Sequence, residues 1–295
     1  MNKQRILRVG SRDSQLAVQQ ARIVMQSIQR VFPEIQMELI TMKTTGDRIL
    51  NRRLDQIGGK GLFVKELDQA LRDDRIDISV HSLKDLPMEV PEDLPLMAFS
   101  RREDPRDVLI YRPEVTNQLL QQGGIIGSSS QRRILQLKQL YPACEFRSIR
   151  GNVQTRLRKL LEEDYQATVL AAAGVKRLSM EQVIGRYFTV EEIIPAAGQG
   201  IMVIQGRKGE NVEMLRQINC QSSEIAARCE RSFVRELDGG CSAPIAAYAM
   251  IQGDQLILHG LYAEEDKQDF VTGQLQGSSQ EPEALGIRLA RLLKG

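Results

Sequence analysis

The chain has 295 residues, which is long for a single hydrophobic core and favours two or three domains. With 40 basic and 38 acidic residues, no tryptophan and 4% aromatic residues, it lacks the global positive field and the base-stacking surfaces typical of nucleic-acid-binding proteins. The longest apolar run, residues 169–175, is too short to cross a bilayer, and no hydrophobic signal region opens the sequence, so we expect a cytoplasmic protein without a membrane partner.

Apolar patterns in the first hundred residues predict an α/β unit. Their spacing predicts strands at residues 6–9, 38–42 and 76–80, and helices at residues 17–31 and after the glycine-rich stretch 58–61. Such an alternation of strands and helices is typical of a largely parallel sheet with helices on its faces.

The third predicted strand runs directly into His81-Ser82-Leu83-Lys84-Asp85-Leu86-Pro87. A cation and a carboxylate therefore lie side by side where a strand gives way to a proline-terminated loop. In open α/β sheets, ligands bind just beyond the carboxyl ends of strands, so Lys84 and Asp85 are candidate site residues. The alternative is a surface ion pair before a turn.

A second α/β unit and a smaller module follow. Residues 100–107 are charged, contain Pro105 and lack periodicity, which predicts a crossover between domains. Further strands are predicted at residues 124–127, 145–149, 168–173 and 201–205, the last of them after a flexible segment at 195–200. From about residue 222, a helix, a hairpin broken at Gly253-Asp254 and a last helix at 282–294 predict a small α+β module.

One device recurs at the strand ends: a small-residue turn that carries arginine or lysine and leads into a helix. Amides at helix N-termini bind anions, whereas a cation there opposes the helix dipole at a cost of about 0.3–1 kcal/mol. A bound anion would remove that cost, so the recurrence predicts an anion-binding cleft; for any single arginine the alternative is a solvated surface role. Since the chain has no Walker loop or GxGxxG motif, a ligand with several carboxylates is favoured over a nucleotide. The cations concerned are Arg12, Lys60, Lys84, Arg132, Arg133, Arg150, Arg156 and Arg177.

The four cysteines form no CxxC pair and there are only two histidines, so we expect no metal site and reduced thiols. Cys144, Cys220 and Cys229 are interpreted as small buried hydrophobic residues. Cys241 follows two glycines and precedes Ser-Ala-Pro, which indicates an exposed loop. A nucleophilic thiol must be accessible to its substrate and have a lowered pKa, and the sequence indicates only the accessibility.

A series of ordered motifs resembles the porphobilinogen deaminases, also called hydroxymethylbilane synthases, which are transferases of tetrapyrrole (porphyrin and heme) biosynthesis. The resemblance covers essentially the whole chain. The motifs are VGSRDSQLA, TTGDRIL, GGKGLFVKELDQAL, DISVHSLKDLP, REDPRDVLI, GSSSQRR, RSIRGNVQTRL, AAAGVKRL, PAAGQG and ELDGGCSAPI.

This resemblance implies an α/β fold with two periplasmic-binding-protein-like (type 2) domains joined by a hinge, plus a small α+β C-terminal domain. Domain 1 would comprise residues 1–100 and 200–218 and carry the catalytic aspartate, with the strand at 201–205 returning to it. Domain 2 would comprise residues 105–195 and bind carboxylates of cofactor and substrate. Domain 3, residues 222–295, would carry the cofactor cysteine.

The resemblance also implies the chemistry. Family members carry a dipyrromethane in thioether linkage to the cysteine that matches Cys241. Porphobilinogen loses ammonia to give an azafulvene-type cation, which the free α-position of the growing chain attacks. Four units are added head to tail, and hydrolysis releases linear hydroxymethylbilane. Asp85 matches the catalytic aspartate, whose carboxylate suits proton transfer and stabilisation of a cationic pyrrole.

Each pyrrole bears acetate and propionate groups, so the cationic turns acquire a polyanionic ligand. We expect porphobilinogen as the small-molecule partner, no nucleic-acid partner, and a monomer. The positions that match cofactor- and substrate-binding residues of the family are Arg12, Ser14, Lys84, Ser130, Arg132, Arg133, Arg150, Arg156 and Arg177, with Lys60 and Gln199 near the cleft and hinge.

Three positions depart from the commoner family pattern: Ser128 replaces threonine, Gln131 replaces leucine and Gln205 replaces glutamate. These changes bear on details of cofactor contact more than on the reaction. The main alternative function is a non-catalytic, two-lobed anion-binding protein, which would explain the arginines but not Asp85 together with Cys241. Nucleic-acid binding is a more distant alternative.

Overall fold

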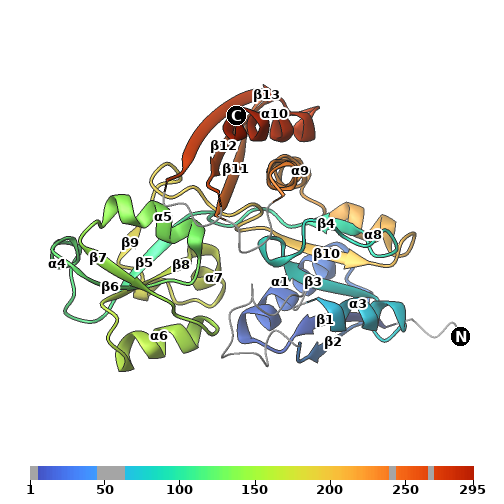
Figure 1. The fold of residues 1–295 in the computed structure, drawn as a ribbon. Coiled ribbons are helices and arrows are strands. Elements are labelled where there is room, and N and C mark those ends of the chain that lie inside the picture. The colour runs from blue at the N-terminus through green and yellow to red at the C-terminus, as the bar shows by residue number, and fades with distance from the viewer. Residues whose placement is uncertain (1–5, 45–63, 239–243, 265–268) are drawn as a thin grey trace, which may run out of the picture. The chain divides into compact units, whose positions relative to one another are not determined.

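The computed structural model describes residues 6–44, 64–238, 244–264 and 269–295, so the predicted site residues Lys60 and Cys241 lie outside the described residues. The chain divides into two compact units, whose helices and strands are labelled in Figure 1. Unit 1 comprises Met1–Arg102 and Ile201–Glu224, and unit 2 comprises Glu103–Gly200 and Ile225–Gly295. Within the described ranges, no helix is long and apolar enough to cross a membrane. The division into three domains stays a prediction.

Unit 1 is built on a five-stranded sheet in the order β2-β1-β3-β10-β4. Strand β1 pairs in parallel with β2 and β3, whereas β10 pairs antiparallel with both β3 and β4. The strand that follows residue 200 therefore completes a sheet that begins at residue 7. The strands are β1 (Leu7–Arg12), β2 (Met37–Met42), β3 (Ile78–Ser82), β4 (Leu96–Phe99) and β10 (Met202–Gly206).

Strand alternation gives the sheet of unit 1 two apolar faces. Helices α1 (Gln15–Val31) and α8 (Val212–Ile218) cover one face, where they pack on Val9, Val80 and neighbouring residues. Helix α3 (Lys65–Arg72) covers the other, over a second cluster that includes Ile76. Gly10 points toward α3, and a side chain there would collide with Ile76, so glycine allows this close packing.

The α/β part of unit 2 repeats this plan in a sheet of order β7-β6-β8-β5-β9. Strand β6 is parallel to β7 and β8, and β5 is antiparallel to β8 and β9. Helices α4 and α5 cover one face and α6 and α7 the other. The elements are β5 (Asp107–Tyr111), α4 (Asn117–Gln121), β6 (Gly124–Gly127), α5 (Gln131–Leu140), β7 (Cys144–Arg147), α6 (Val153–Glu162), β8 (Ala167–Ala171), α7 (Ala172–Arg177) and β9 (Arg186–Tyr187).

Both five-stranded sheets share one topology. Each has three parallel strands, then an antiparallel strand that enters after a crossover, then an edge strand. This is the type 2 periplasmic-binding-protein topology expected from the sequence, and with the α+β region that follows, the predicted fold class is confirmed.

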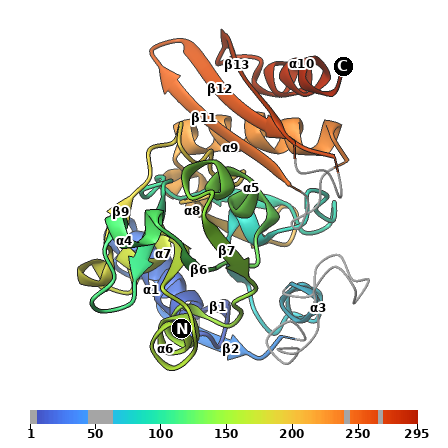
Figure 2. The ribbon, with the colours of Figure 1, turned by 60° about the vertical axis from the view of Figure 1, so that its left-hand side comes forward.

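The C-terminal part of unit 2 is an antiparallel sheet of β11 (Ile245–Gln252), β12 (Gln255–Tyr262) and β13 (Val271–Ser278) with two helices (Figure 2). Helices α9 (Gln221–Glu236) and α10 (Pro282–Lys294) pack on the same face, because Gly260 of β12 faces both Phe233 and Leu289. The predicted hairpin and last helix are confirmed. Strand β13 was not predicted.

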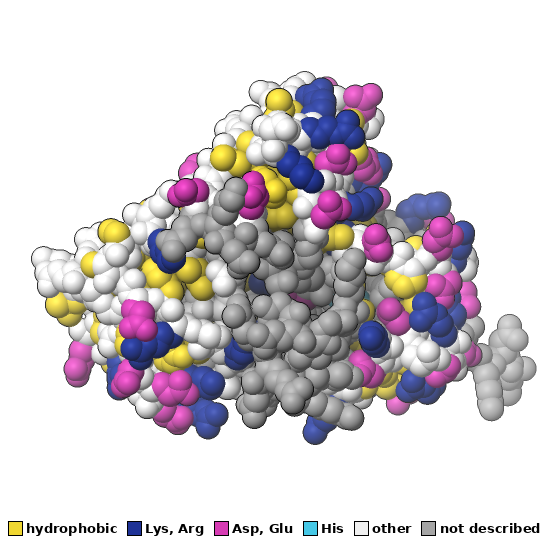
Figure 3. All heavy atoms as spheres, viewed as in Figure 1, with side chains coloured by type: hydrophobic (Ala, Val, Ile, Leu, Met, Phe, Trp, Pro, Cys, Tyr) yellow, Lys and Arg dark blue, Asp and Glu magenta, His cyan; other side chains and the backbone are white. Residues whose placement is uncertain are grey.

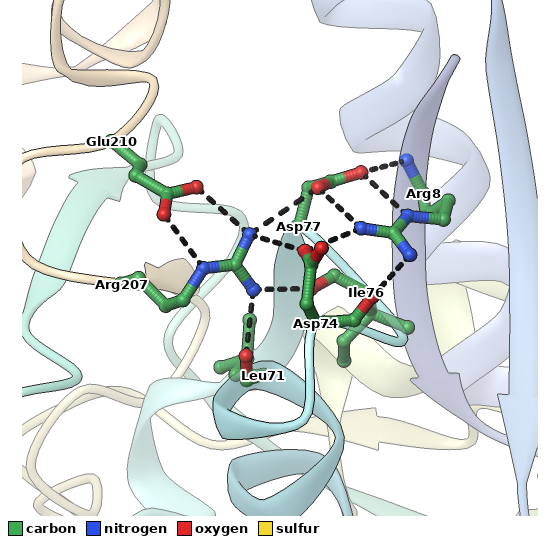
Figure 4. A network of polar contacts seen from close by, with 7 residues as sticks. All are labelled: Arg8, Leu71, Asp74, Ile76, Asp77, Arg207 and Glu210. Carbon is green, nitrogen blue, oxygen red and sulfur yellow. Dashed lines mark hydrogen bonds and ion pairs between the residues drawn. The ribbon is translucent and has the colours of Figure 1, made fainter. Parts of the chain in front are cut away.

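An ion-pair network centred on the buried carboxylate of Asp77, which we call the Asp77 clamp, holds three strands of unit 1 together (Figure 4). The Asp77 side chain is 2% exposed, accepts hydrogen bonds from the backbone N (2.7 Å) and Nε (3.0 Å) of Arg8 on β1, and lies directly before β3. Arg207, which follows β10, donates to the carbonyl oxygens of Leu71 (2.6 Å) and Ile76 (2.7 Å) and pairs with Asp77 at 3.3 Å. The clamp therefore links β1 and β3 to the strand that arrives last.

We predict that Asp77→Asn lowers the free energy of unfolding by about 3 kcal/mol, because two guanidinium groups lose the buried carboxylate between them. Urea denaturation followed by far-UV circular dichroism measures this loss. The control is Glu210→Gln, which removes a partner of Arg207 whose side chain is 43% exposed and should cost less than about 1 kcal/mol. Equal losses in the two variants would contradict a clamp centred on Asp77.

Candidate functional site

The carboxyl edge of the sheet in unit 1 carries four of the predicted site residues. Arg12 is the last residue of β1, and Ser82 ends β3, which is parallel to β1. A 3₁₀ turn, η2 (Leu83–Asp85), follows β3 at once and brings Lys84 and Asp85 to this edge. Ser14 is the N-cap residue of α1 and accepts a hydrogen bond from the Ala17 amide at 3.3 Å.

The turn that bears Asp85 is anchored on both sides. Leu83 is fully buried and Leu86 is 2% exposed, and the Leu83 amide donates to the Ile201 carbonyl of the crossover before β10 at 3.0 Å. Between these anchors Asp85 is exposed and Lys84 half-buried. Among the described residues no ion pair joins Asp85 to Lys84 or to another cation, so the structure does not show the alternative of a Lys84–Asp85 surface pair.

A buried polar patch lies behind this edge, between β3, β10 and α3. His81 Nε2 lies 2.9 Å from the Ser79 hydroxyl, and Gln205 donates to the Leu94 carbonyl at 2.9 Å. Burial lowers the pKa of His81 to about 4, and the charge of Arg12 contributes to the lowering. Burial also raises the pKa of Asp68 on α3 to about 6. His81 is therefore neutral near pH 7 and adds no charge behind Arg12.

The matching edge in unit 2 is formed by the ends of β6, β7 and β8. Parallel pairing brings the loops after β6 and β7 together, and Ser129 joins them by contacting the Ser148 hydroxyl at 2.8 Å and donating to the Ile149 carbonyl at 2.8 Å. Ser130 is the N-cap residue of α5, and half-buried Arg150 follows in the second loop. These two predicted binding residues thus lie at the same sheet edge.

Asp107 organises three of the predicted binding residues in unit 2. It is the first residue of β5 and its side chain is fully buried. Arg132 Nη2 lies 2.8 Å from one carboxylate oxygen, while Arg133 Nη2 at 2.7 Å and Gln199 Nε2 at 2.9 Å both donate to the other. Sequence reasoning missed Asp107; its local signal is an acidic residue at the start of an apolar strand.

This cluster holds a surplus of positive charge away from water. Arg132 and Arg133 are 5% and 7% exposed, and among the described residues they share one carboxylate. Burial lowers the pKa of Arg132, and Arg133 Nε is buried without a hydrogen-bond partner in the described part of the chain. A buried cation of this kind favours the binding of an anion nearby.

The surplus is local. On the face drawn in Figure 3, acidic and basic side chains of the described residues are interspersed, as the net charge of +2 suggests. Within those residues, no group of three or more histidine, cysteine, aspartate or glutamate side chains could hold a metal ion. The predicted binding residues at this sheet edge and beside it carry guanidinium, hydroxyl and amide groups.

Two further arginines of unit 2 are tied to backbone carbonyls. Arg156, in the first turn of α6, donates from Nε to Gly151 at 2.9 Å. Arg177, at the end of α7, donates to Gly200 at 2.6 Å, and burial lowers its pKa to about 10. Arg177 thus contacts the segment before β10, whereas Arg156 stands beside the loop that contains Arg150.

The family model described as "Porphobilinogen deaminase, dipyromethane cofactor binding domain" matches residues 7–214, and "Porphobilinogen deaminase, C-terminal domain" matches residues 225–295. A porphobilinogen deaminase of Ruminiclostridium josui is 52% identical over 288 residues, covering 98% of this chain and 97% of the relative. One of Acetivibrio thermocellus is 49% identical over 290 residues, covering 98% of each chain.

Solved structures give a more distant likeness. The methionine-binding protein MetQ aligns with a TM-score of 0.46 and 12% identity, covering 72% of this chain and 89% of that one. The full-length relatives and the two family models decide the assignment. The chain belongs to the porphobilinogen deaminase family, and the activity in tetrapyrrole biosynthesis that its motifs predicted is confirmed.

Proposed function

We propose that this chain adds four porphobilinogen units, with loss of ammonia and head to tail, to a dipyrromethane held by a thioether to Cys241. Hydrolysis then releases linear hydroxymethylbilane. The observation that carries the proposal is the buried positive surplus at Asp107, where Arg132 and Arg133 share one carboxylate. A ligand whose pyrroles each bear an acetate and a propionate supplies the missing negative charge.

The residues of unit 2 fit the dipyrromethane. The buried Nε of Arg133 makes no hydrogen bond within the described residues, and Ser130 is the N-cap of α5, whose first amides can bind an anion. We assign Arg132, Arg133 and Arg150 to its carboxylates, with Ser130 and Arg156 beside them. When bound, the group supplies the free α-position to which each new unit is joined.

The residues of unit 1 fit the reacting substrate. Asp85 is an exposed carboxylate on a turn fixed by Leu83 and Leu86, so it can face a ligand without rearrangement of the backbone. It would take and return the protons and stabilise the cation formed when ammonia leaves. Lys84, Arg12 and Ser14 at the same edge would hold substrate carboxylates, and Lys60, Gln199 and Arg177 complete the predicted set.

The compartment, the oligomeric state and the domain division of the enzyme are further parts of the proposal. We infer that it works as a cytoplasmic monomer divided into the three domains expected from the sequence, with residues 101–106 and 195–200 as the hinge. Cys144, Cys220 and Cys229 are free thiols, as suits a reducing compartment. Light scattering that finds a stable dimer would contradict the monomer.

Intact mass tests the attachment at Cys241. In cells that make porphobilinogen, we predict a purified chain heavier than its sequence by one dipyrromethane, and an unmodified chain for Cys241→Ser. The matched control is Cys220→Ser. Burial raises the pKa of the Cys220 thiol, but hydrogen bonds with Ser222 and Ser223 outweigh this and leave the pKa below its usual value, which makes Cys220 the strongest rival nucleophile. An adduct lost in Cys220→Ser and kept in Cys241→Ser would refute the proposal.

We predict that Asp85→Ala keeps its fold and its dipyrromethane but consumes porphobilinogen at least about 100-fold more slowly, because a positioned proton-transfer group is lost. An exposed side chain leaves no cavity, so far-UV circular dichroism should match the parent. Glu89→Gln, an exposed carboxylate four positions further on, is the control and should turn over normally. Normal turnover in Asp85→Ala would end the catalytic assignment.

Arg150→Ala should weaken substrate addition or cofactor assembly by about 10- to 100-fold, since a charge-assisted hydrogen bond to a carboxylate contributes roughly 1.5–3 kcal/mol. Steady-state kinetics and the holoenzyme fraction measure the loss. Arg147→Ala is the control, because Arg147 is exposed on β7 and pairs with Glu145. Arg132→Ala should combine the same functional loss with lower stability, because Asp107 would lose one cation. Unchanged kinetics in both Arg150→Ala and Arg132→Ala would argue against the carboxylate assignment.

A further inference from the structure

Glu230 is a fully buried carboxylate on α9 with two backbone amides as hydrogen-bond donors. One oxygen accepts from the Gly198 amide at 2.6 Å and the other from the Ala249 amide at 2.7 Å. Burying a carboxylate is costly unless its lone pairs are satisfied, and short charge-assisted bonds to both oxygens meet that need. Glu230 stands in the apolar stripe of α9 formed by Ala226, Ala227, Phe233 and Val234, where packing alone would favour a hydrophobic residue.

The two donors place Glu230 at a junction. Ala249 lies on β11, so the bond from the Ala249 amide joins α9 to the strand that follows it in the chain. Residues 239–243, which lie outside the described residues, connect these two elements and include Cys241. Glu230 therefore fixes the helix before the cofactor cysteine against the strand after it.

The bond from the Gly198 amide joins α9 and β11 to the segment that contacts the Asp107 cluster. Gly198 has a φ of 75°, a conformation that favours glycine, and the next residue, Gln199, donates to Asp107 at 2.9 Å. Asp107 in turn pairs with Arg132 and Arg133. The same segment contacts β11 a second time, through the Ala247 amide and the Pro195 carbonyl at 3.1 Å. A continuous path of polar contacts within unit 2 thus runs from β11 through Glu230 to the two arginines.

We propose that Glu230 is a positioning residue for the dipyrromethane: it holds α9 and β11, the elements before and after the cofactor cysteine in the chain, against the segment that carries Gln199, and so fixes both relative to the arginines that would bind the cofactor's carboxylates. The inference rests on the proposed attachment at Cys241. A group held at one end by a covalent bond reaches its charged partners only if anchor and partners keep a fixed separation, and small displacements at such sites are costly.

The test is Glu230→Gln, because glutamine keeps the shape but turns an NH₂ group toward one of the two amide donors. The chain is produced in cells that make no porphobilinogen and is then mixed with porphobilinogen, and intact mass follows formation of the adduct. We expect attachment to slow by about 10- to 100-fold. The matched control is Ser232→Ala on the same helix, whose buried hydroxyl donates to the Cys229 (2.8 Å) and Glu283 (3.1 Å) carbonyls and not to the junction.

Both variants should lose stability in urea, and only Glu230→Gln should lose attachment rate beyond that loss. Attachment that falls in both variants in proportion to stability would overturn the proposal, as would a normal rate in Glu230→Gln. Failure of attachment at Cys241 itself gives a different result, because the parent chain would then carry no adduct that depends on Cys241.

A measurement that needs no Glu230 variant covers the case in which Glu230→Gln does not fold. Hydrogen exchange is compared between the holoenzyme and Cys241→Ser, with the Val169 amide of central strand β8 as the reference for global stability. The Gly198 and Ala249 amides should exchange at least about tenfold more slowly in the holoenzyme, beyond any change at Val169, because attachment fixes the junction. Equal changes at all three amides would overturn the proposal.

Discussion

The buried carboxylate of Asp107 is the interaction on which the functional edge of the second sheet depends. It stands at the start of β5 and receives Arg132, Arg133 and Gln199, which come from α5 and from the segment before β10. With a single cation the cluster would be neutral and purely structural. With two it keeps positive charge out of water, at a cost to folding that a carboxylate ligand lowers. The arginines are therefore fixed before any ligand arrives, which is how a protein prepares electrostatic binding.

Asp85 is held in the opposite manner. The backbone of its turn is fixed by Leu83, Leu86 and the bond to Ile201, but its carboxylate is exposed and not paired with any described residue. A group that must exchange protons and meet a transient cation is better served by access than by a permanent partner, since a fixed cation would hold it ionised and compete with the substrate. The two α/β sheets thus present charge in different ways. In unit 2 the cations are fixed and partly neutralised by Asp107, whereas in unit 1 the Asp85 carboxylate is exposed and open to a ligand.

Much of the fold could be predicted because apolar periodicity is a local signal. The alternation of Ile76, Ile78 and Val80 marked β3, and the leucines of residues 282–294 marked α10. Strand β13 was not predicted because its segment, VTGQLQGS, has few apolar residues and is defined by pairing with β12. The position of Asp85 after a strand could be predicted for the same local reason. The burial of Arg132 and Arg133 against Asp107 could not be predicted, because the contact joins residues about 25 positions apart.

The antiparallel insertion of β10 also has a consequence for how the chain acquires its structure. All strands of the second sheet lie between residues 107 and 187, so that sheet can assemble as soon as this stretch has left the ribosome. The first sheet cannot: β3 and β4 stay separated until residues 202–206 pair with both. Closing so long a loop slows folding, and the unpaired edges of β3 and β4 are open to other chains meanwhile. The N-terminal sheet, although made first, is therefore completed later, and its open strand edges are exposed to aggregation until then.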